Sequence, residues 1–171
     1  YAESNAGGSA VGIGDLNGDG FGEAVIGAPG DYVYTYNYSL TPHHQGLGTH
    51  AGTSYVVFGK NTLGASVPTA NLYELAAGNT APLPNPGAFP TAGFRIEGRA
   101  VYSLVTVGKT NVGFGANAVP VGDVNNDGKK DFIVGAKKDT GDGGGLFGRA
   151  YLIFGNQSAN IKVDERDGVY N

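Results

Sequence analysis

The sequence predicts an all-β protein built from a repeated sheet unit, and three observations support this class. Glycine accounts for 31 of the 171 residues, far above the average of about 7%, and it falls in turns and at the ends of short apolar runs. Those runs are rich in β-branched residues, which favour buried strands. The best helical candidate, residues 71–77, would make one or two turns at most.

Composition excludes several functional classes. The formal net charge is −4 and the Lys and Arg residues are scattered, so we expect no nucleic-acid partner. The chain has no cysteine, which excludes disulfides, zinc–thiolate sites and thiol catalysis. No apolar run approaches the roughly 18 residues that a membrane helix needs, so membrane insertion is not expected. The sequence does not begin with Met, which indicates a processed product or an excerpt.

Two short acidic motifs carry the candidate chemistry. Residues 15–23 read DLNGDGFGE, and residues 123–131 read DVNNDGKKD. Each has an acidic or amide side chain at positions 1, 3, 5 and 9, and Gly at position 6. Ca²⁺ takes roughly six to eight oxygen ligands, and the Gly permits the turn that returns position 9 to the ion. With position 7 giving its backbone carbonyl, the predicted ligands are Asp15, Asn17, Asp19, Phe21, Glu23, Asp123, Asn125, Asp127, Lys129 and Asp131.

The flanking residues place each motif between two strands. A helix-flanked Ca²⁺ loop requires a bidentate Glu at position 12, whereas position 12 here is Ile26 or Val134. Short apolar runs bounded by glycine precede and follow both motifs, so each ion is expected at the tip of a β-hairpin. A metal-free turn rich in Asx and Gly is the alternative. Two copies in register favour the metal, with a structural role.

The repetition extends beyond the two motifs. Residues 55–59 (YVVFG) match residues 151–155 (YLIFG) at an offset of 96, against 108 for the motifs, so one connection is 12 residues shorter in the second copy. Residues 93–98 add a further strand to the first copy. Each repeat is predicted to form four antiparallel strands, as in one propeller blade. Residues 1–100 make the first unit, with a Tyr-rich insertion and a Pro-rich linker, and residues 101–171 the second.

Two further motifs suggest a family. Gly113-Phe114-Gly115 before the second loop, and Gly27-Ala28-Pro29 after the first, resemble the FG-GAP repeat of integrin α-subunit-like β-propellers. Residues 55–60 are similar to the third strand of bacterial FG-GAP proteins. The resemblance implies one Ca²⁺ per blade. The sequence departs from the pattern at Glu23, where Asp is usual, at Lys137, which replaces Pro, and at residues 5–8, where Phe-Gly is absent.

Two blades are too few for a closed propeller, which needs about four to eight. The chain is therefore an excerpt of a longer propeller, a subunit of a ring, or a unit of an open head-to-tail fibre. Residues 161–171 are a candidate for strand addition to a neighbouring molecule. We expect a secreted, calcium-stabilised structural or adhesion protein that self-assembles through blade edges. The alternative is a ligand-recognition fragment of a larger integrin-like propeller, with a protein or glycan ligand.

Location and catalysis follow from similar reasoning. An open Ca²⁺ loop suits the millimolar calcium outside cells, so we expect an extracellular or cell-surface protein. No paired acid and base and no activated nucleophile is evident, so enzymatic activity is not expected.

Three other clusters leave alternatives open. The rings of Tyr32, Tyr34, Tyr36 and Tyr38 would share one face of a strand, and would serve as a subunit interface, a cross-strand ladder or a sugar platform. His43, His44 and His50 form either a transition-metal site or, as we favour, a solvated polar loop. Asp139 and Asp142 are a weaker cation candidate in a Gly-rich turn.

Overall fold

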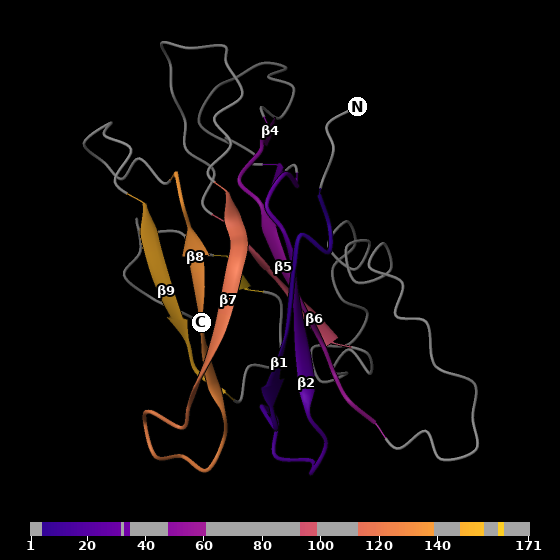
Figure 1. The fold of residues 1–171 in the computed structure, drawn as a ribbon, viewed down its shortest axis with the longest axis vertical. Coiled ribbons are helices and arrows are strands. Elements are labelled where there is room, and N and C mark those ends of the chain that lie inside the picture. Colours follow the sequence, from indigo (N-terminus) through magenta and orange to yellow (C-terminus); the bar gives the residue numbers. More distant parts are fainter. Residues whose placement is uncertain are drawn as a thin grey trace, which may run out of the picture.

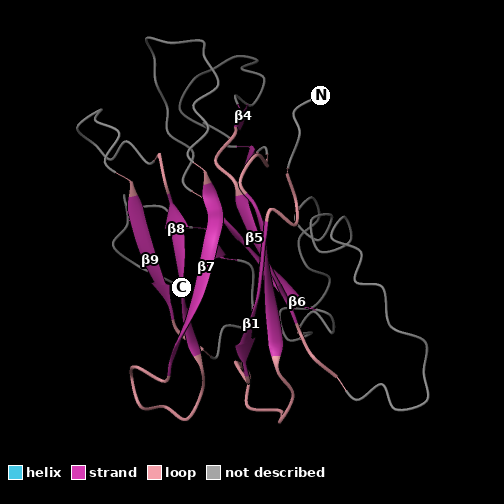
Figure 2. Cartoon of the chain, in the orientation of Figure 1, coloured by secondary structure: helices cyan, strands magenta, loops and turns pink. Residues whose placement is uncertain are grey.

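The computed structural model describes residues 5–31, 33–34, 48–60, 93–98, 113–138, 148–155 and 161–162. Within these ranges the chain forms strands and turns only, which confirms the predicted all-β class (Figure 1, Figure 2). The described residues accordingly include no helix with the length and apolar character needed to span a membrane.

The first sheet contains the predicted four-stranded antiparallel unit. Its strands lie in the order β1 (Ser9–Gly14), β2 (Glu23–Ala28), β5 (Thr53–Val57) and β6 (Gly93–Glu97). The short strands β3 (Val33–Tyr34) and β4 (Gly48–Thr49) pair with each other in a separate two-stranded sheet. The strands of the first repeat therefore lie where the apolar runs predict them.

The second sheet differs from its predicted form. It contains β7 (Phe114–Gly122), β8 (Asp131–Ala136) and β9 (Arg149–Ile153), so its described part has three antiparallel strands where the sequence predicts four. The next strand, β10 (Ile161–Lys162), pairs in parallel with β6 of the first sheet. The open edge of β6 offers unpaired backbone groups to an extended segment. Residues 163–171 lie outside the described residues, so strand donation by the tail stays a prediction.

The two sheets pack face to face around one apolar core. In the first sheet, Val25, Val56 and Phe94 are directly opposite one another across β2, β5 and β6. They share a single buried cluster with side chains of the second sheet, and β7 lies beside β1 and β2 (Figure 1). The second sheet contributes Phe114, Phe132, Val134, Ala136, Tyr151 and Ile153 to this cluster. The two repeats thus form one structural unit.

The start of β7 approaches the first sheet so closely that glycine is required there. A Cβ atom on Gly27 would lie 1.8 Å from the carbonyl oxygen of Gly115, and one on Gly115 would lie 2.6 Å from the carbonyl oxygen of Thr53. The amide of Phe114 donates to the carbonyl of Ala51 at 3.1 Å. The Phe-Gly motif of the second repeat and the Gly-Ala-Pro motif of the first therefore meet at the junction between the sheets.

Candidate metal centre

Both acidic motifs form hairpin loops at the same end of the molecule, one between β1 and β2 and the other between β7 and β8 (Figure 1). Gly20 and Gly128, at position 6, have φ angles of 89° and 86°, which glycine adopts without steric cost. Gly18 and Asn126, at position 4, also have positive φ angles, and Asn is among the few other residues that tolerate this region. The two loops therefore share positive-φ turns at the same two positions.

In the first loop, backbone amides hold the acidic side chains inside the turn. The Asp15 carboxylate accepts hydrogen bonds from the amides of Gly18 at 2.7 Å, Asp19 at 3.1 Å and Gly20 at 2.9 Å. Asn17 accepts from the Asp19 amide at 2.9 Å, and its Nδ2 donates to Asp19 Oδ2 at 2.9 Å. Positions 1, 3 and 5 are thus oriented by the loop itself.

The second loop repeats much of this network. Asp123 accepts from the amides of Asp127 at 3.0 Å and Gly128 at 2.8 Å. Asn125 accepts from the Asp127 amide at 3.2 Å and donates to Asp127 Oδ2 at 3.0 Å. The hydrogen bond from the Lys129 amide, together with the one from the Asn125 side chain, lowers the pKa of Asp127. The exposed carboxylate of Asp127 is therefore held in its ionised form.

Position 9 ties each loop to the third strand of its repeat. In the second repeat, Asp131 accepts from the amide of Val124 at 2.7 Å and from that of Gly155 at 2.8 Å. Gly155 follows β9, so one carboxylate joins the hairpin loop to the far strand. Sequence reasoning missed this role of Gly155, although the shared Phe-Gly ending of YVVFG and YLIFG was an available signal.

Glu23 makes the same connection in the first repeat. Its carboxylate accepts from the Leu16 amide at 2.5 Å and from the Gly59 amide at 3.4 Å. Glu23 is only 2% exposed. Burial raises the pKa of its carboxyl group, the two amide hydrogen bonds lower it, and the nearby charges of Asp19 and Asp15 raise it further, with a net increase. The fold therefore holds this acidic group where negative charge is unfavourable.

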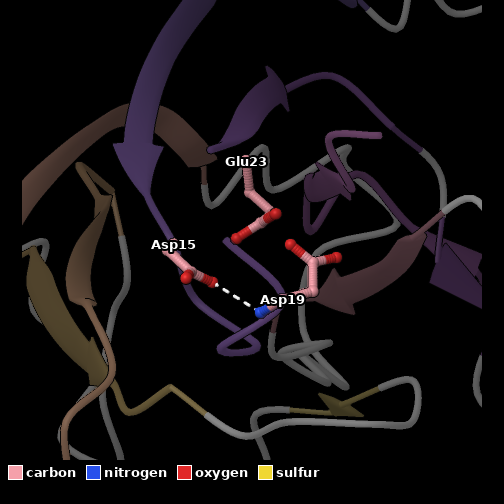
Figure 3. Close-up of side chains that lie close together, drawn as sticks. All are labelled: Asp15, Asp19 and Glu23. Atoms are coloured by element: carbon pink, nitrogen blue, oxygen red, sulfur yellow. Dashed lines mark hydrogen bonds between the residues drawn. The ribbon is translucent and has the colours of Figure 1, made fainter. Parts of the chain in front are cut away.

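Asp15, Asp19 and Glu23 converge on one space. One carboxylate oxygen from each lies within 4.8 Å of the other two, and the three groups point toward one another (Figure 3). Oxygen ligands lie about 2.3–2.6 Å from Ca²⁺, so two that share an ion are at most roughly 5 Å apart. The three carboxylates fit a single hard cation, whose charge would offset their repulsion.

The carboxylate groups of the second loop lie less close together than those of the first. Within the described ranges, Asp123, Asp127 and Asp131 do not form a group of carboxylate oxygens as close as that of the first loop. Asp131 is one methylene shorter than Glu23, and both of its oxygens already accept short hydrogen bonds. Glu23, at the position where Asp is usual, thus belongs to the more compact of the two acidic clusters.

Most of the alternating tyrosines of residues 32–38, and two of the three histidines, lie outside the described residues. Tyr34 lies in β3, where only its backbone is described, and its backbone is paired with Gly48. The remaining residues of these groups, and the weaker cation candidates, lie outside the described residues: Tyr32, Tyr36, Tyr38, His43, His44, Asp139 and Asp142. Their predicted roles stay predictions.

His50 differs from the expectation of a solvated loop. Its side chain is buried, and its Nδ1 donates to the carbonyl oxygen of Gly30 at 2.9 Å. Burial of an imidazole is favourable when its ring nitrogens find partners in the protein, and the turn after β2 supplies one. His50 therefore has a structural contact that the sequence did not indicate.

These observations define a class of protein: paired antiparallel sheets whose first hairpins carry Asp-rich loops suited to a cation. A comparison with protein families agrees, because residues 7–57 match the model of the FG-GAP repeat. That segment contains β1, the first acidic loop, β2 and β5. No curated protein matches the sequence. The FG-GAP prediction is therefore confirmed for residues 7–57.

Proposed function

We propose that the protein is a calcium-stabilised, extracellular structural or adhesion module of the propeller-blade type. The observation that carries this proposal is the convergence of Asp15, Asp19 and Glu23 at the tip of the first hairpin. The FG-GAP match over the same segment supports it. Extracellular modules bind Ca²⁺ at about 10⁻⁴–10⁻³ M, so such loops are occupied at the calcium concentrations outside cells. The role is structural rather than enzymatic.

The residues that would hold the ion are those of the two loops. Asp15, Asn17, Asp19 and Glu23 would serve in the first loop, with the Phe21 carbonyl. The second site would use Asp123, Asn125, Asp127, Asp131 and the Lys129 carbonyl. The bound ion supplies positive charge to these oxygens. The chain's own contribution is to orient them, because the position-9 carboxylates are fastened by amides after β5 and β9.

Calcium binding is tested by calorimetry and thermal unfolding in EDTA and in Ca²⁺. Each filled site is expected to stabilise the folded protein by about 2.7 kcal/mol at a hundredfold excess over Kd. Asp19→Asn should abolish one binding event and Asp127→Asn the other. Asp31→Asn removes the same charge outside both loops and should leave both events intact. Identical melting curves in EDTA and Ca²⁺ would refute the proposal.

A further inference from the structure

The junction inside this chain shows how one repeat packs on another. We call the side of the second sheet that contacts the first its docking face, and the covered side of the first sheet its receiving face. Together they bury a common cluster. The docking face of the second sheet contains Ala118, Phe132, Val134, Ala136, Tyr151 and Ile153, and the receiving face of the first contains Val11, Val25, Val56, Phe58 and Phe94.

The repeat gives the second sheet a receiving face of its own. At the offsets of 108 and 96, its residues are Val119, Ile133, Leu152 and Phe154. Val119, Ile133 and Leu152 are direct neighbours across β7, β8 and β9. They lie on the side opposite the core, where Val119 is 54% exposed and Leu152 43% exposed, whereas Val56, the equivalent of Leu152, is fully buried. This apolar row lacks the cover that its counterpart has.

The loop residues at position 2 show the same difference. Leu16 is fully buried and belongs to the shared core, and a Cβ atom on Gly155 of the second sheet would lie 3.0 Å from its carbonyl oxygen. Val124, its equivalent in the second loop, is 51% exposed. Position 2 is therefore buried in the loop that packs against the second sheet and exposed in the loop of the second sheet itself.

The first sheet, in turn, has a docking face, formed by Ala10, Ala24, Ile26, Ala28, Tyr55 and Val57. Ala10 is exposed, whereas its equivalent Ala118 packs against the core. Ala24, Ile26 and Val57 are half-buried, whereas Ala28 and Tyr55 are already buried within the chain itself. The accessible part of this face therefore consists of Ala10, Ala24, Ile26 and Val57. The side chains at these positions are small or apolar in both sheets, as a shared packing role requires.

The close contact between Gly27 and Gly115 has an equivalent pair of glycines, Gly135 and Gly7, that do not touch each other within one molecule. Gly7, equivalent to Gly115, has a φ angle of 85° against 82°, and no atom lies within 4 Å of a Cβ placed on it. Gly135 is equivalent to Gly27, yet the nearest atom to its Cβ would be 3.9 Å away. Both halves of the contact are thus present, one in each sheet, and neither has a partner glycine at contact distance.

We propose that a second copy of this chain docks its first sheet on the second sheet of the first copy and repeats the internal junction. Val119, Ile133, Leu152 and Phe154 would receive Ala10, Ile26 and Val57, and Gly7 would approach Gly135. The contact is heterologous, so it closes into a ring or extends as a filament according to the rotation between copies. The inference rests on the proposed function and names its partner. It assigns the contact between copies to the faces of the sheets, whereas the sequence suggested the blade edges.

Sedimentation velocity in Ca²⁺ tests the interface with one charged variant on each face. Leu152→Glu blocks the receiving face and Ala10→Glu the docking face, while Lys138→Gln changes the net charge equally in the exposed turn after β8. Wild type and Lys138→Gln should associate with increasing concentration, and each face variant alone should be monomeric. An equimolar mixture of the two face variants should form dimers, because one intact face remains on each.

A second variant separates loss of docking from loss of folding. A Cβ atom on Gly135 would make only an ordinary van der Waals contact within one molecule, 3.9 Å from the Asn117 carbonyl oxygen, so Gly135→Val should keep a melting temperature close to that of wild type while association is lost. Monomeric wild type at all concentrations, or association by Leu152→Glu equal to wild type, would overturn the inference. Association that persists when calcium gives no thermal shift would contradict the calcium role alone. A calcium shift without association would contradict the interface alone.

Discussion

A single methylene distinguishes the two acidic loops at position 9. Glu23 and Asp131 each accept two backbone hydrogen bonds, one from the amide at position 2 of the loop and one from the amide of the glycine after the third strand. Only the longer side chain joins a group of three carboxylates within 4.8 Å among the described residues. Burial and the neighbouring charges of Asp19 and Asp15 raise the pKa of Glu23, so its ionised form is less favourable here than that of an exposed carboxyl group.

Replacing Glu23 by Gln should separate stability from calcium binding. The amide is isosteric and carries no charge into the buried site. It keeps one acceptor for the Leu16 amide and gives up only the acceptor of the longer, 3.4 Å hydrogen bond from Gly59. We expect Glu23→Gln to melt at a higher temperature than wild type in EDTA, and to bind Ca²⁺ in the first loop more weakly, because the site loses one charged oxygen ligand. Thermal melts and calorimetry measure both. A lower melting temperature in EDTA would show that the charge is not a cost to the folded state.

Tyr55 should make the stability of the folded protein decrease at alkaline pH. Its hydroxyl donates to Asp31 Oδ2 at 2.6 Å, and burial, then this hydrogen bond, raises the pKa of Tyr55 well above its usual value. Between the unfolded and folded pKa values the folded state binds the additional proton. The free energy of unfolding should therefore fall as pH rises above about 10.

Tyr55→Phe removes that titrating group and isolates its effect. The variant should lose part of the stability at pH 8, because Asp31 loses a hydrogen-bond donor, but its stability should fall less steeply above pH 10. Urea unfolding at a series of pH values compares the two proteins. Parallel curves for wild type and variant would rule out Tyr55 as the source of the alkaline loss.

At the scale of elements, β7 fixes the position of the second sheet against the first. Its first residues lie on β2 and β5 at backbone contact distance. Phe114 fills the core beside Tyr151, with ring centroids 5.5 Å apart, while Gly115 lets the two backbones meet. Side chains larger than hydrogen at this contact would force the sheets apart.

Alanine substitutions at equivalent glycines test this contact. Gly27→Ala places a methyl group 1.8 Å from the Gly115 carbonyl oxygen, so it should lower the free energy of unfolding by roughly 1–3 kcal/mol or more. Gly135→Ala, at the matching position of the second sheet, meets no atom closer than 3.9 Å and should be close to neutral. Chemical denaturation measures both. Equal losses for the two variants would contradict the described packing.

At the scale of the whole molecule, the two repeats share one apolar core. Leu16 of the first loop is buried in the cluster that holds Phe132 and Val134 of the second sheet, and the Lys130 amide donates to the Asp15 carbonyl at 3.1 Å. The two acidic loops are therefore parts of the sheet–sheet junction. If calcium binds these loops as proposed, its binding would therefore also stabilise the junction between the two sheets.

Much of the fold was predictable because it depends on local pattern. The strands around both loops follow from β-branched runs bounded by glycine, and the loops from acidic and amide residues at fixed positions. The contact between Tyr55 and Asp31, and the burial of His50, were not predictable, because they join residues separated along the chain. The pairing of β10 with β6 likewise depends on which sheet edge is open. A local sequence pattern does not indicate which edge that is.

The sequence by itself determined the repeat, its strands and the two oxygen-rich loops, since each depends on spacing along a few residues. Tertiary structure decided which repeat positions are covered. Val56 and Leu152 are equivalent and both apolar, yet one is fully buried and the other 43% exposed. The difference arises because a sheet has two faces, and within the described residues the first sheet covers one face of the second sheet while Leu152 lies on the other. This is a property of packing that no single position encodes.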